Sequence, residues 1–326
     1  MSDQPLITVL ITCYNRKEFL IDAVNSALSQ TLPKQYYEIL VIKNFHDNGI
    51  DKFLDRNNIN YFTKNGSERY FLKLGVQKAN GQILSFLDDD DLFTRDKLKV
   101  VNEIFQNAEI SYYHNNFEAF MSGRVIKEKM VASPNQMRLL IKNSDKLKKI
   151  YWLEKMLAYE NNSSISIRKK ILEPWFDQVE KQIELPIYNI DRFLYLTALL
   201  SADSMYIDNR KLTYYRLHEN QTSALMRNDY DSLVQKKLEF IEKSLIAFDR
   251  MAEMSEGSPF TDYVKTRLTN LKIAYNFWSS TKRYSIGLND YKLFLREHDL
   301  YEIPRVAILS SPPFLRRALI KLIYQV

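Results

Sequence analysis

Short apolar runs and segments of helical periodicity alternate along the N-terminal part of the chain. Residues 6–12 (LITVLIT) and 37–45 (YEILVIKNF) are almost continuous runs of apolar residues, typical of strands buried on both faces of a parallel sheet. Between them, residues 20–28 place leucine, valine and alanine at the spacing of one helix face. Asn15 and Glu18 resemble an N-capping pair for this helix.

The same alternation continues beyond the second apolar run. Residues 59–65 form a weaker strand pattern, and residues 68–80 a helix that we expect to end at Gly81 as its C′ glycine. Residues 83–87 (ILSFL) are a further strand. Strand, helix, strand, strand, helix, strand in this order predicts an α/β fold with a three-layer, mostly parallel sheet.

The rest of the chain divides into a mixed part and a helical part. From about residue 225 the pattern changes to long amphipathic helices. We therefore expect a first domain over 1–224 and a helical C-terminal region over 225–326. In between, the pattern predicts a helix over 95–106 capped by Thr94, a strand over 110–120, helical structure over 133–160, a helix over 188–201 and a strand over 205–216.

Four consecutive aspartates, Asp88 to Asp91, directly follow the strand 83–87. Alternation along an extended chain points Asp88 and Asp90 to the same side and Asp89 away from it. Two carboxylates on one side suit Mg²⁺ or Mn²⁺, which prefer oxygen ligands. The competing interpretation is a solvated acidic turn that favours the N-terminus of the next helix, and the cluster alone does not decide between the two.

The surroundings of the aspartates favour a binding site. The turn CYNR (13–16) and the residues KNF (43–45) also follow predicted strands. Ligands of open parallel sheets bind beyond the carboxyl ends of the strands. Because three such ends converge on one edge of the predicted sheet, we expect a ligand there.

Composition narrows the class of protein further. The chain has 326 residues, 45% of them hydrophobic, and a net charge of +6, without the run of five or six basic residues that a nucleic-acid binder usually carries. Cys13 is the single cysteine, which excludes an intrachain disulfide and favours a reducing, cytoplasmic setting. We expect no signal peptide, because the N-terminus lacks a basic n-region and a small-residue cleavage site, and no membrane span, because the apolar stretches are shorter than about 20 residues.

Five segments of the chain carry a further signal, and they are 7–32, 37–44, 81–93, 188–196 and 214–223. Together they resemble glycosyltransferase family 2, because they occur in the family's order and separations, and the resemblance covers roughly residues 5–223. It implies a GT-A (Rossmann-like) fold and metal-dependent, inverting transfer of a sugar from a nucleotide diphospho-sugar, a UDP-sugar foremost. The acceptor would be a hydroxyl of a glycan, a lipid-linked sugar or a protein glycan.

The resemblance also assigns roles to single residues around the aspartates. Asp88 and Asp90 occupy the outer positions of the family's D-x-D motif, where the second carboxylate ligates Mn²⁺ or Mg²⁺ and the first contacts ribose or metal. Asp89, between them, is grouped with the donor-binding residues. Asp91 matches a following acidic residue, and its role stays open between support of the site and helix capping.

Further roles follow for residues on other segments. Asp191 lies where the family carries the carboxylate that deprotonates the acceptor, although it could equally cap the helix 192–201. Arg216 and His218 match a segment that closes over the diphosphate, where the histidine can join the metal shell. A lone histidine is more often an ordinary, partly buried side chain. Thr12, Tyr14 and Asn15 lie on the first nucleotide-binding loop.

Two departures from the family leave the base of the donor open. After the second strand the family carries two acidic residues, one of which recognises the base, and here the positions are Lys43 and Asn44. Asn44 can still pair with a base edge through its amide, so we group it with the donor-binding residues. Leu72 and Lys73 stand where the family usually has an arginine and an asparagine.

Two other functions compete with transfer of a sugar. A GT-A-like nucleotidyltransferase would carry a glycine-rich, basic loop after the first strand, which CYNRKEF is not. A non-catalytic nucleotide-sugar or glycan-binding protein of the same fold would not need the intact Asp88, Asp90, Asp191 and His218.

The C-terminal segment 310–326 has the pattern of a short basic amphipathic helix, with Arg316, Arg317 and Lys321 among apolar residues. Such a helix over 312–326 can lie on an anionic membrane surface. It can equally pack on its own domain or on the partner in a homodimer.

Overall fold

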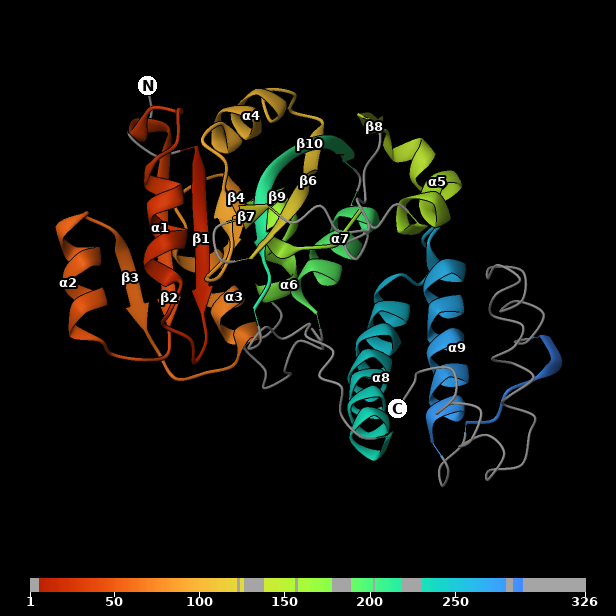
Figure 1. Ribbon diagram of the computed structural model, residues 1–326. Coiled ribbons are helices and arrows are strands. Elements are labelled where there is room, and N and C mark those ends of the chain that lie inside the picture. The colour runs from red at the N-terminus through yellow and green to blue at the C-terminus, as the bar shows by residue number, and fades with distance from the viewer. Residues whose placement is uncertain are drawn as a thin grey trace. The chain divides into compact units, whose positions relative to one another are not determined.

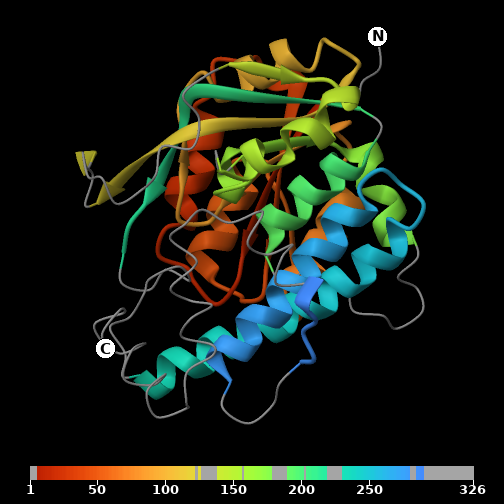
Figure 2. The ribbon, with the colours of Figure 1, turned by 90° about the vertical axis from the view of Figure 1, so that its right-hand side faces the viewer.

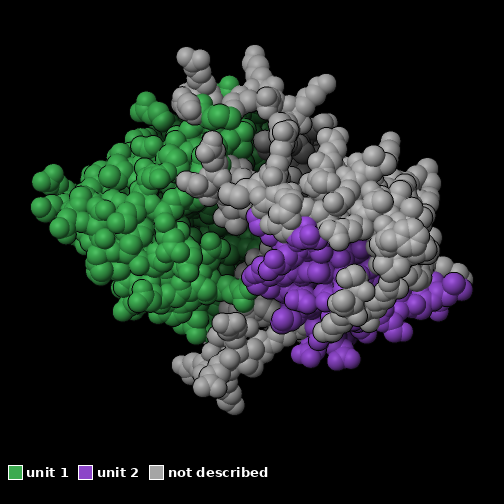
Figure 3. All heavy atoms as spheres, turned by 60° about the horizontal axis from the view of Figure 1, so that its bottom comes forward, with its two compact units in different colours: residues 1–184, 189–219 green, residues 185–188, 220–326 purple. Residues whose placement is uncertain are grey.

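The computed structural model divides the chain into two compact units. Unit 1 comprises residues 1–184 and 189–219, and unit 2 comprises residues 185–188 and 220–326 (Figure 3). The structure describes residues 6–121, 124–125, 138–155, 158–177, 189–201, 203–218, 230–279 and 284–289.

Unit 1 is built on one mixed sheet, whose strands follow the order β3-β2-β1-β4-β9-β6-β10-β5 (Figure 1). β1 pairs in parallel with β2 and β4, β2 with β3, and β6 with β10. β9 is antiparallel to both of its neighbours, β4 and β6. The strands are β1 Ile7–Cys13, β2 Tyr37–Lys43, β3 Asn60–Thr63, β4 Ile83–Asp88, β5 Leu92–Phe93, β6 Ile110–Met121, β7 Arg124–Val125, β8 Leu139–Ile141, β9 Ile165–Arg168 and β10 Ser204–Arg216.

Helices cover both faces of this sheet, which completes the three layers. On one face, the alternate residues Ile7, Val9 and Ile11 of β1 join one core with apolar side chains of α1 (Leu20–Leu28), α2 (Asn48–Arg56) and α4 (Lys97–Ile104). On the other face, Leu10 packs against α3 (Glu68–Lys78), which in turn contacts α6 (Glu173–Asp177). Aromatic contact between Phe176 and Phe193 continues this layer to α7 (Ile190–Leu200). The predicted mostly parallel α/β sheet is confirmed.

Several local predictions were wrong. Helix α2 was not predicted from the sequence. Its N-cap Asp47 accepts hydrogen bonds from the N–H groups of Gly49 and Ile50. Part of the predicted helical segment 133–160 is instead strand β8, and helix α5 occupies Asn143–Lys155. Asp96, not Thr94, is the N-cap residue of α4. Asn15 and Glu18 lie before α1, which begins after Phe19, so they do not cap it.

Gly81 does not serve as the C′ residue of α3, because Ala79 is the C-cap of that helix and Gly81 lies two residues beyond it. The residue is required for close approach to β1. A Cβ at position 81 would lie 2.5 Å from the backbone nitrogen of Thr8 and 2.7 Å from the carbonyl carbon of Ile7. The N–H of Gly81 also donates a hydrogen bond to Thr8 Oγ1 at 2.9 Å. The glycine therefore lets the start of β4 reach the start of β1.

Unit 2 contains a pair of long helices, α8 (Tyr230–Met254) and α9 (Thr261–Trp278). The two helices lie side by side (Figures 1 and 2). Ile241 and Leu245 of α8 share one buried cluster with Tyr275, Phe277 and Trp278 of α9. None of the helices in the described residues combines the length and the apolar character that crossing a bilayer requires. The predicted amphipathic helix 312–326 lies outside the described residues.

The substitution Gly81→Ala should lower the free energy of unfolding by about 1–3 kcal/mol, because the added methyl group overpacks the contact between β1 and β4. Urea denaturation followed by circular dichroism measures this change. Gly49→Ala is the matched control, since its Cβ meets only Asp47 Oδ1 at 3.4 Å within α2. The control should be neutral or stabilise by up to about 1 kcal/mol. Equal losses in the two variants would contradict the packing argument.

Candidate active site

The carboxyl ends of β1, β2 and β4 meet at one edge of the sheet, as the sequence predicts. The strand register aligns Thr12 of β1 with Asp88 of β4, and Cys13 of β1 with Lys43 of β2. The residues that follow these strands, including the four aspartates, therefore lie at the same edge. This edge is the candidate active site.

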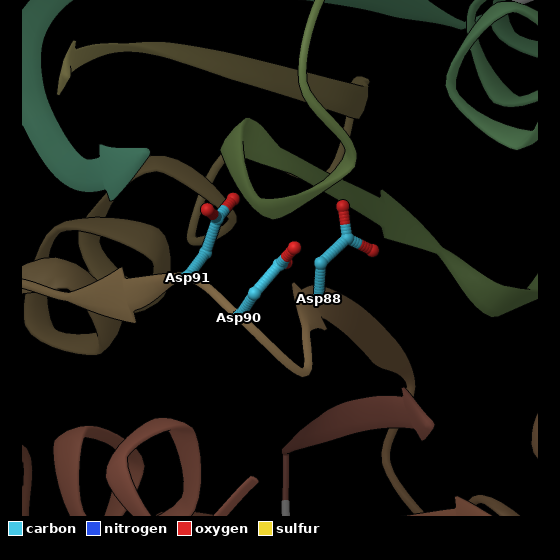
Figure 4. Close-up of side chains that lie close together, drawn as sticks. All are labelled: Asp88, Asp90 and Asp91. Carbon is cyan, nitrogen blue, oxygen red and sulfur yellow. The ribbon is translucent and has the colours of Figure 1, made fainter. Parts of the chain in front are cut away.

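Asp88, Asp90 and Asp91 form a compact group of carboxylates at the end of β4. One oxygen from each lies within 4.8 Å of the others. All three side chains extend to the same side of the turn (Figure 4). Asp91 is 1% exposed, and its Oδ1 accepts a hydrogen bond from the N–H of Arg216 at 2.9 Å. Its Oδ2 is buried and has no hydrogen-bond partner among the described residues. The sequence left the role of Asp91 open. In the structure its carboxylate belongs to the same group as those of Asp88 and Asp90.

Burial and mutual repulsion make this group unfavourable when it is fully ionised. Burial, and then the charge of Asp90, raises the pKa of Asp91 to about 8. The pKa of Asp88 is also well above its ordinary value, first through burial and then through the charges of Asp91 and Asp90. A divalent cation would offset both effects, and its preferred ligands are carboxylate oxygens. The closeness of the three oxygens, and an Asp91 Oδ2 that accepts no hydrogen bond from the described part of the chain, therefore fit Mg²⁺ or Mn²⁺.

The end of β10 contacts this group through two predicted site residues. His218 Nε2 lies 2.9 Å from Asp90 Oδ2. Arg216 donates from Nε to the Asp90 carbonyl oxygen at 2.7 Å and from an amino group to Asp22 at 3.1 Å. Its guanidinium carbon lies 4.3 Å from the centre of the Phe19 ring. Arg216 therefore fixes the acidic turn against α1, a contact that the sequence did not predict.

Asp89 lies outside the three-carboxylate group. It is 4% exposed and forms an ion pair with Arg16, which also pairs with Asp90 at 2.8 Å. Arg16 belongs to the turn CYNR but was not among the predicted site residues, because a strand-end arginine carries no signal of its partner. Since Arg16 bridges two of the four aspartates, it counterbalances part of their charge. Because Asp89 is buried and ion-paired, we expect its substitution to be unfavourable.

The predicted nucleotide-binding loop is held by contacts between the ends of β1 and β2. Asn44 Oδ1 accepts a hydrogen bond from the N–H of Asn15 at 2.9 Å, and its Nδ2 donates to Asn15 Oδ1 at 2.6 Å. Asn15 has a positive φ of 58°. Tyr14, 42% exposed, packs its ring edge against Phe71. The partly buried Thr12 is the last predicted member, level with Asp88. The Asn44 amide is thus engaged with the protein itself.

Lys43 is fully buried rather than facing the edge of the sheet. Its Nζ donates to the Phe45 carbonyl oxygen at 2.7 Å and to Thr63 Oγ1 at 2.9 Å. It also forms an ion pair with Asp51 of α2 at 2.8 Å. The lysine therefore fastens the loop after β2 to β3 and α2.

Asp191 lies in the first turn of α7, but Asn189 is the N-cap of that helix. The capping alternative for Asp191 is therefore wrong. Burial raises the pKa of Asp191 to about 7, while the backbone N–H and the charge of Arg192 act in the opposite direction. A carboxyl with this pKa can gain and lose a proton near neutral pH. Its role as the base remains a prediction.

A turn over residues 161–163 links Asp191 to the three carboxylates. Asn162 Nδ2 donates to Asp88 Oδ1 at 3.0 Å, and the N–H of Asp88 donates to Ser163 Oγ at 2.9 Å. On the other side, the backbone N–H of Asn161 lowers the pKa of Asp191. This turn, which precedes β9, was missed in the sequence, because only the antiparallel pairing of β9 with β4 brings it to this edge.

Two solved structures are similar to this fold. The crystal structure of Staphylococcus aureus TarS 1-349 is 15% identical, with a TM-score of 0.55, and the match covers 89% of this chain and 78% of that one. A mannosyltransferase from Pyrobaculum calidifontis is 12% identical, with a TM-score of 0.54, and the match covers 99% of this chain and 88% of that one. The fold is therefore the GT-A fold.

Residues 8–166, which include the four aspartates and the 161–163 turn, match the family described as Glycosyl transferase family 2. Residues 8–166 are therefore similar to a glycosyltransferase family 2 domain. An uncharacterized glycosyltransferase of Rickettsia felis is 30% identical over 117 residues, which are 34% of this chain and 19% of that protein. The putative teichuronic acid biosynthesis glycosyltransferase TuaG of Bacillus subtilis is 21% identical over 41% of this chain and 55% of its own length. This chain thus spans only a fifth to about half the length of these relatives.

The carboxylate group predicts how stability changes with pH. Asp88, Asp91 and Asp191 have raised pKa values in the folded protein, so the folded chain binds more protons than the unfolded chain between about pH 4 and pH 8. Without metal, the free energy of unfolding should therefore fall as pH rises through this range. The slope should approach about 1.4 kcal/mol per pH unit for each proton released. Urea denaturation at several pH values measures it.

Added Mn²⁺ should reverse this loss at the alkaline end, because a cation bound to ionised Asp88, Asp90 and Asp91 stabilises the folded state. The variant Asp90→Ala should lose the effect of Mn²⁺, and Asp249→Ala, which removes an exposed aspartate of α8, should keep it. Stabilisation by Mn²⁺ of the same size in both variants would place the ion elsewhere.

Proposed function

We propose that the protein is a metal-dependent, inverting glycosyltransferase that moves a sugar from a nucleotide diphospho-sugar to a hydroxyl acceptor. One observation carries the proposal. The three carboxylates that suit a divalent cation and the carboxyl with a pKa of about 7 are joined by the same short turn, residues 161–163. A displacement at a sugar carbon needs these two functions close together, one at the leaving group and one at the attacking group.

Relatives of the same fold support the kind of donor. The TarS 1-349 fragment was solved in complex with UDP-GlcNAc, at a TM-score of 0.52 and 14% identity to this chain. The Pyrobaculum mannosyltransferase was solved with GDP-Man and Mn²⁺. A nucleotide diphospho-sugar, with UDP as the first candidate nucleotide and Mn²⁺ or Mg²⁺ as the ion, is therefore our proposed donor complex.

The residues divide the chemical work between the two ends of the donor. Asp88, Asp90 and Asp91 would hold the cation, with His218 beside Asp90. When bound, the ion supplies Lewis-acid neutralisation of the charge that develops on the departing diphosphate. Arg16 and Arg216 keep the acidic turn in place through their bonds to Asp89 and Asp90.

Asp191 is the proposed general base. In its ionised form it would accept the proton of the acceptor hydroxyl while that oxygen attacks the sugar carbon. Burial keeps its pKa near 7, which brings the carboxylate closer in basicity to the proton that it takes up. A single base acting opposite the leaving group gives inversion of configuration.

The direct test is a screen of the full-length protein with UDP-, GDP- and dTDP-sugars, with and without Mn²⁺. Binding is followed by thermal shift, and slow release of the nucleoside diphosphate by chromatography. We expect one nucleotide series to stabilise the protein only when Mn²⁺ is present. Binding without any release or transfer would favour a non-catalytic nucleotide-sugar-binding protein instead.

The variant Asp191→Asn should keep binding the donor and Mn²⁺ but lose transfer by about 10²–10⁴-fold, because the amide cannot take up the proton. Steady-state transfer to the acceptor gives the rate, and calorimetric titration with donor and Mn²⁺ confirms that the site is intact. Asp203→Asn is a suitable control, since Asp203 is paired with Lys170 outside this site. Transfer by Asp191→Asn at the wild-type rate would remove Asp191 from the mechanism.

A further inference from the structure

The turn 161–163 contains two asparagine side chains with unused hydrogen-bonding capacity. Asn161 is 7% exposed, and its buried Nδ2 has no hydrogen-bond partner among the described residues. Asn162 Oδ1 is likewise buried and without a partner in the described part of the chain. Buried polar atoms are normally hydrogen-bonded, so two such atoms on consecutive residues need an explanation.

The orientation of each amide is fixed by its other atom. Asn161 Oδ1 accepts a hydrogen bond from the N–H of Ser163 at 2.9 Å, which leaves the donor Nδ2 free to bond elsewhere. Asn162 Nδ2 donates to Asp88 Oδ1 at 3.0 Å, which leaves Oδ1 as an acceptor. Exchanging oxygen and nitrogen in either amide would lose these bonds. The turn thus offers one donor and one acceptor.

The backbone of the turn is held in place from several sides. The Ser163 carbonyl oxygen accepts bonds from Thr213 Oγ1 at 3.0 Å and from the buried Lys97 Nζ at 3.2 Å. Asn161 itself has a positive φ of 69°, a conformation that few residues other than glycine adopt. Among the described non-glycine residues, only Asn15, Asn58 and Asn161 have a positive φ. Such strain persists where the surroundings impose it and is common at functional sites.

The position of the turn indicates what it can bind. Asn162 contacts Asp88, and the Asn161 amide lies close enough to Asp91 to lower the pKa of that carboxyl, although no hydrogen bond of acceptable geometry joins them. The backbone of Asn161 is next to Asp191. In a direct displacement, the transferred sugar must lie between the leaving diphosphate and the base. The turn spans that interval.

We propose that Asn161 and Asn162 bind hydroxyl groups of the transferred sugar and so help to select which sugar is transferred. A sugar hydroxyl both donates and accepts, so it can accept from Asn161 Nδ2 or donate to Asn162 Oδ1. The inference rests on the proposed function, because it takes the diphosphate to lie at the three carboxylates and the acceptor at Asp191. It adds a specificity-determining role for residues that neither hold the cation nor move the proton.

The test compares ligands with and without the sugar. The wild-type protein with Mn²⁺ is titrated calorimetrically with UDP, GDP and their glucose, N-acetylglucosamine and mannose conjugates, and the nucleotide series that binds is then used. The measured quantity is the Kd of the nucleotide-sugar divided by the Kd of the nucleoside diphosphate. This ratio cancels effects on the cation and the diphosphate, which both ligands share.

Asn161→Gly keeps the positive φ and removes the amide, and Asn162→Ala removes the second amide. In each variant we expect the ratio to rise by about tenfold, the loss of one buried hydrogen bond, with the Kd of the nucleoside diphosphate nearly unchanged for Asn161→Gly. Asn161→Asp is a second variant of the same shape, in which the donor is replaced by an acceptor, and it should raise the ratio as well.

Asn58→Gly is the matched control, because Asn58 has a similar φ of 53° but lies between α2 and β3. Its ratio should equal that of the wild-type protein. An unchanged ratio in the Asn161 and Asn162 variants, with both ligands weakened equally or not at all, would overturn the inference and leave the turn as support for the carboxylates. Failure of the wild-type protein to bind any of the nucleotides would instead overturn the proposed function, and the inference with it.

Discussion

Repulsion among closely spaced carboxylates is the constraint on which this end of unit 1 depends. Asp88, Asp90 and Asp91 lie within 4.8 Å of one another, and burial raises the pKa of the first and the last. The surrounding residues supply the positive charges and hydrogen-bond donors that offset this repulsion. Arg16 pairs with the turn from the β1 side, Arg216 bonds it from β10, and Asn162 donates to Asp88 from the turn before β9. Three parts of the chain that are distant in the sequence thus meet at this acidic turn, where they supply positive charge and hydrogen-bond donors.

The parallel half of the sheet and its acidic edge could be predicted because their signals are local. Apolar runs mark β1, β2 and β4, and the residues directly after a parallel strand lie at its carboxyl end. The location of Asp88 and Asp90 at this edge could therefore be predicted from the order of the strands, whereas their roles were proposed from the family resemblance. The N-cap assignments at Asn15 and Thr94 failed for the opposite reason. Asn15 bonds with Asn44, 29 positions away, and no local pattern reveals such a partner.

The turn 161–163 escaped prediction because β9 runs against its neighbours. In an antiparallel strand the residues that lie at the carboxyl edge of the sheet come before the strand, not after it. A prediction based on the residues that follow each strand therefore includes Asp88 but not Asn161 and Asn162. The role of Lys43 was left open by the sequence for a different reason, because its ion pair is with Asp51 of α2, a helix that was not predicted. The turn 161–163 and Lys43 could be placed only once the contacts between residues distant in the sequence were known.

His218 places the carboxylate group close to the end of unit 1 in the sequence. Unit 1 ends at residue 219 and unit 2 resumes at residue 220, and Asp90 contacts His218, the second residue after β10. This contact holds the last described residue of unit 1 against the acidic turn. The charge of Asp90 therefore influences how firmly the end of this unit is anchored.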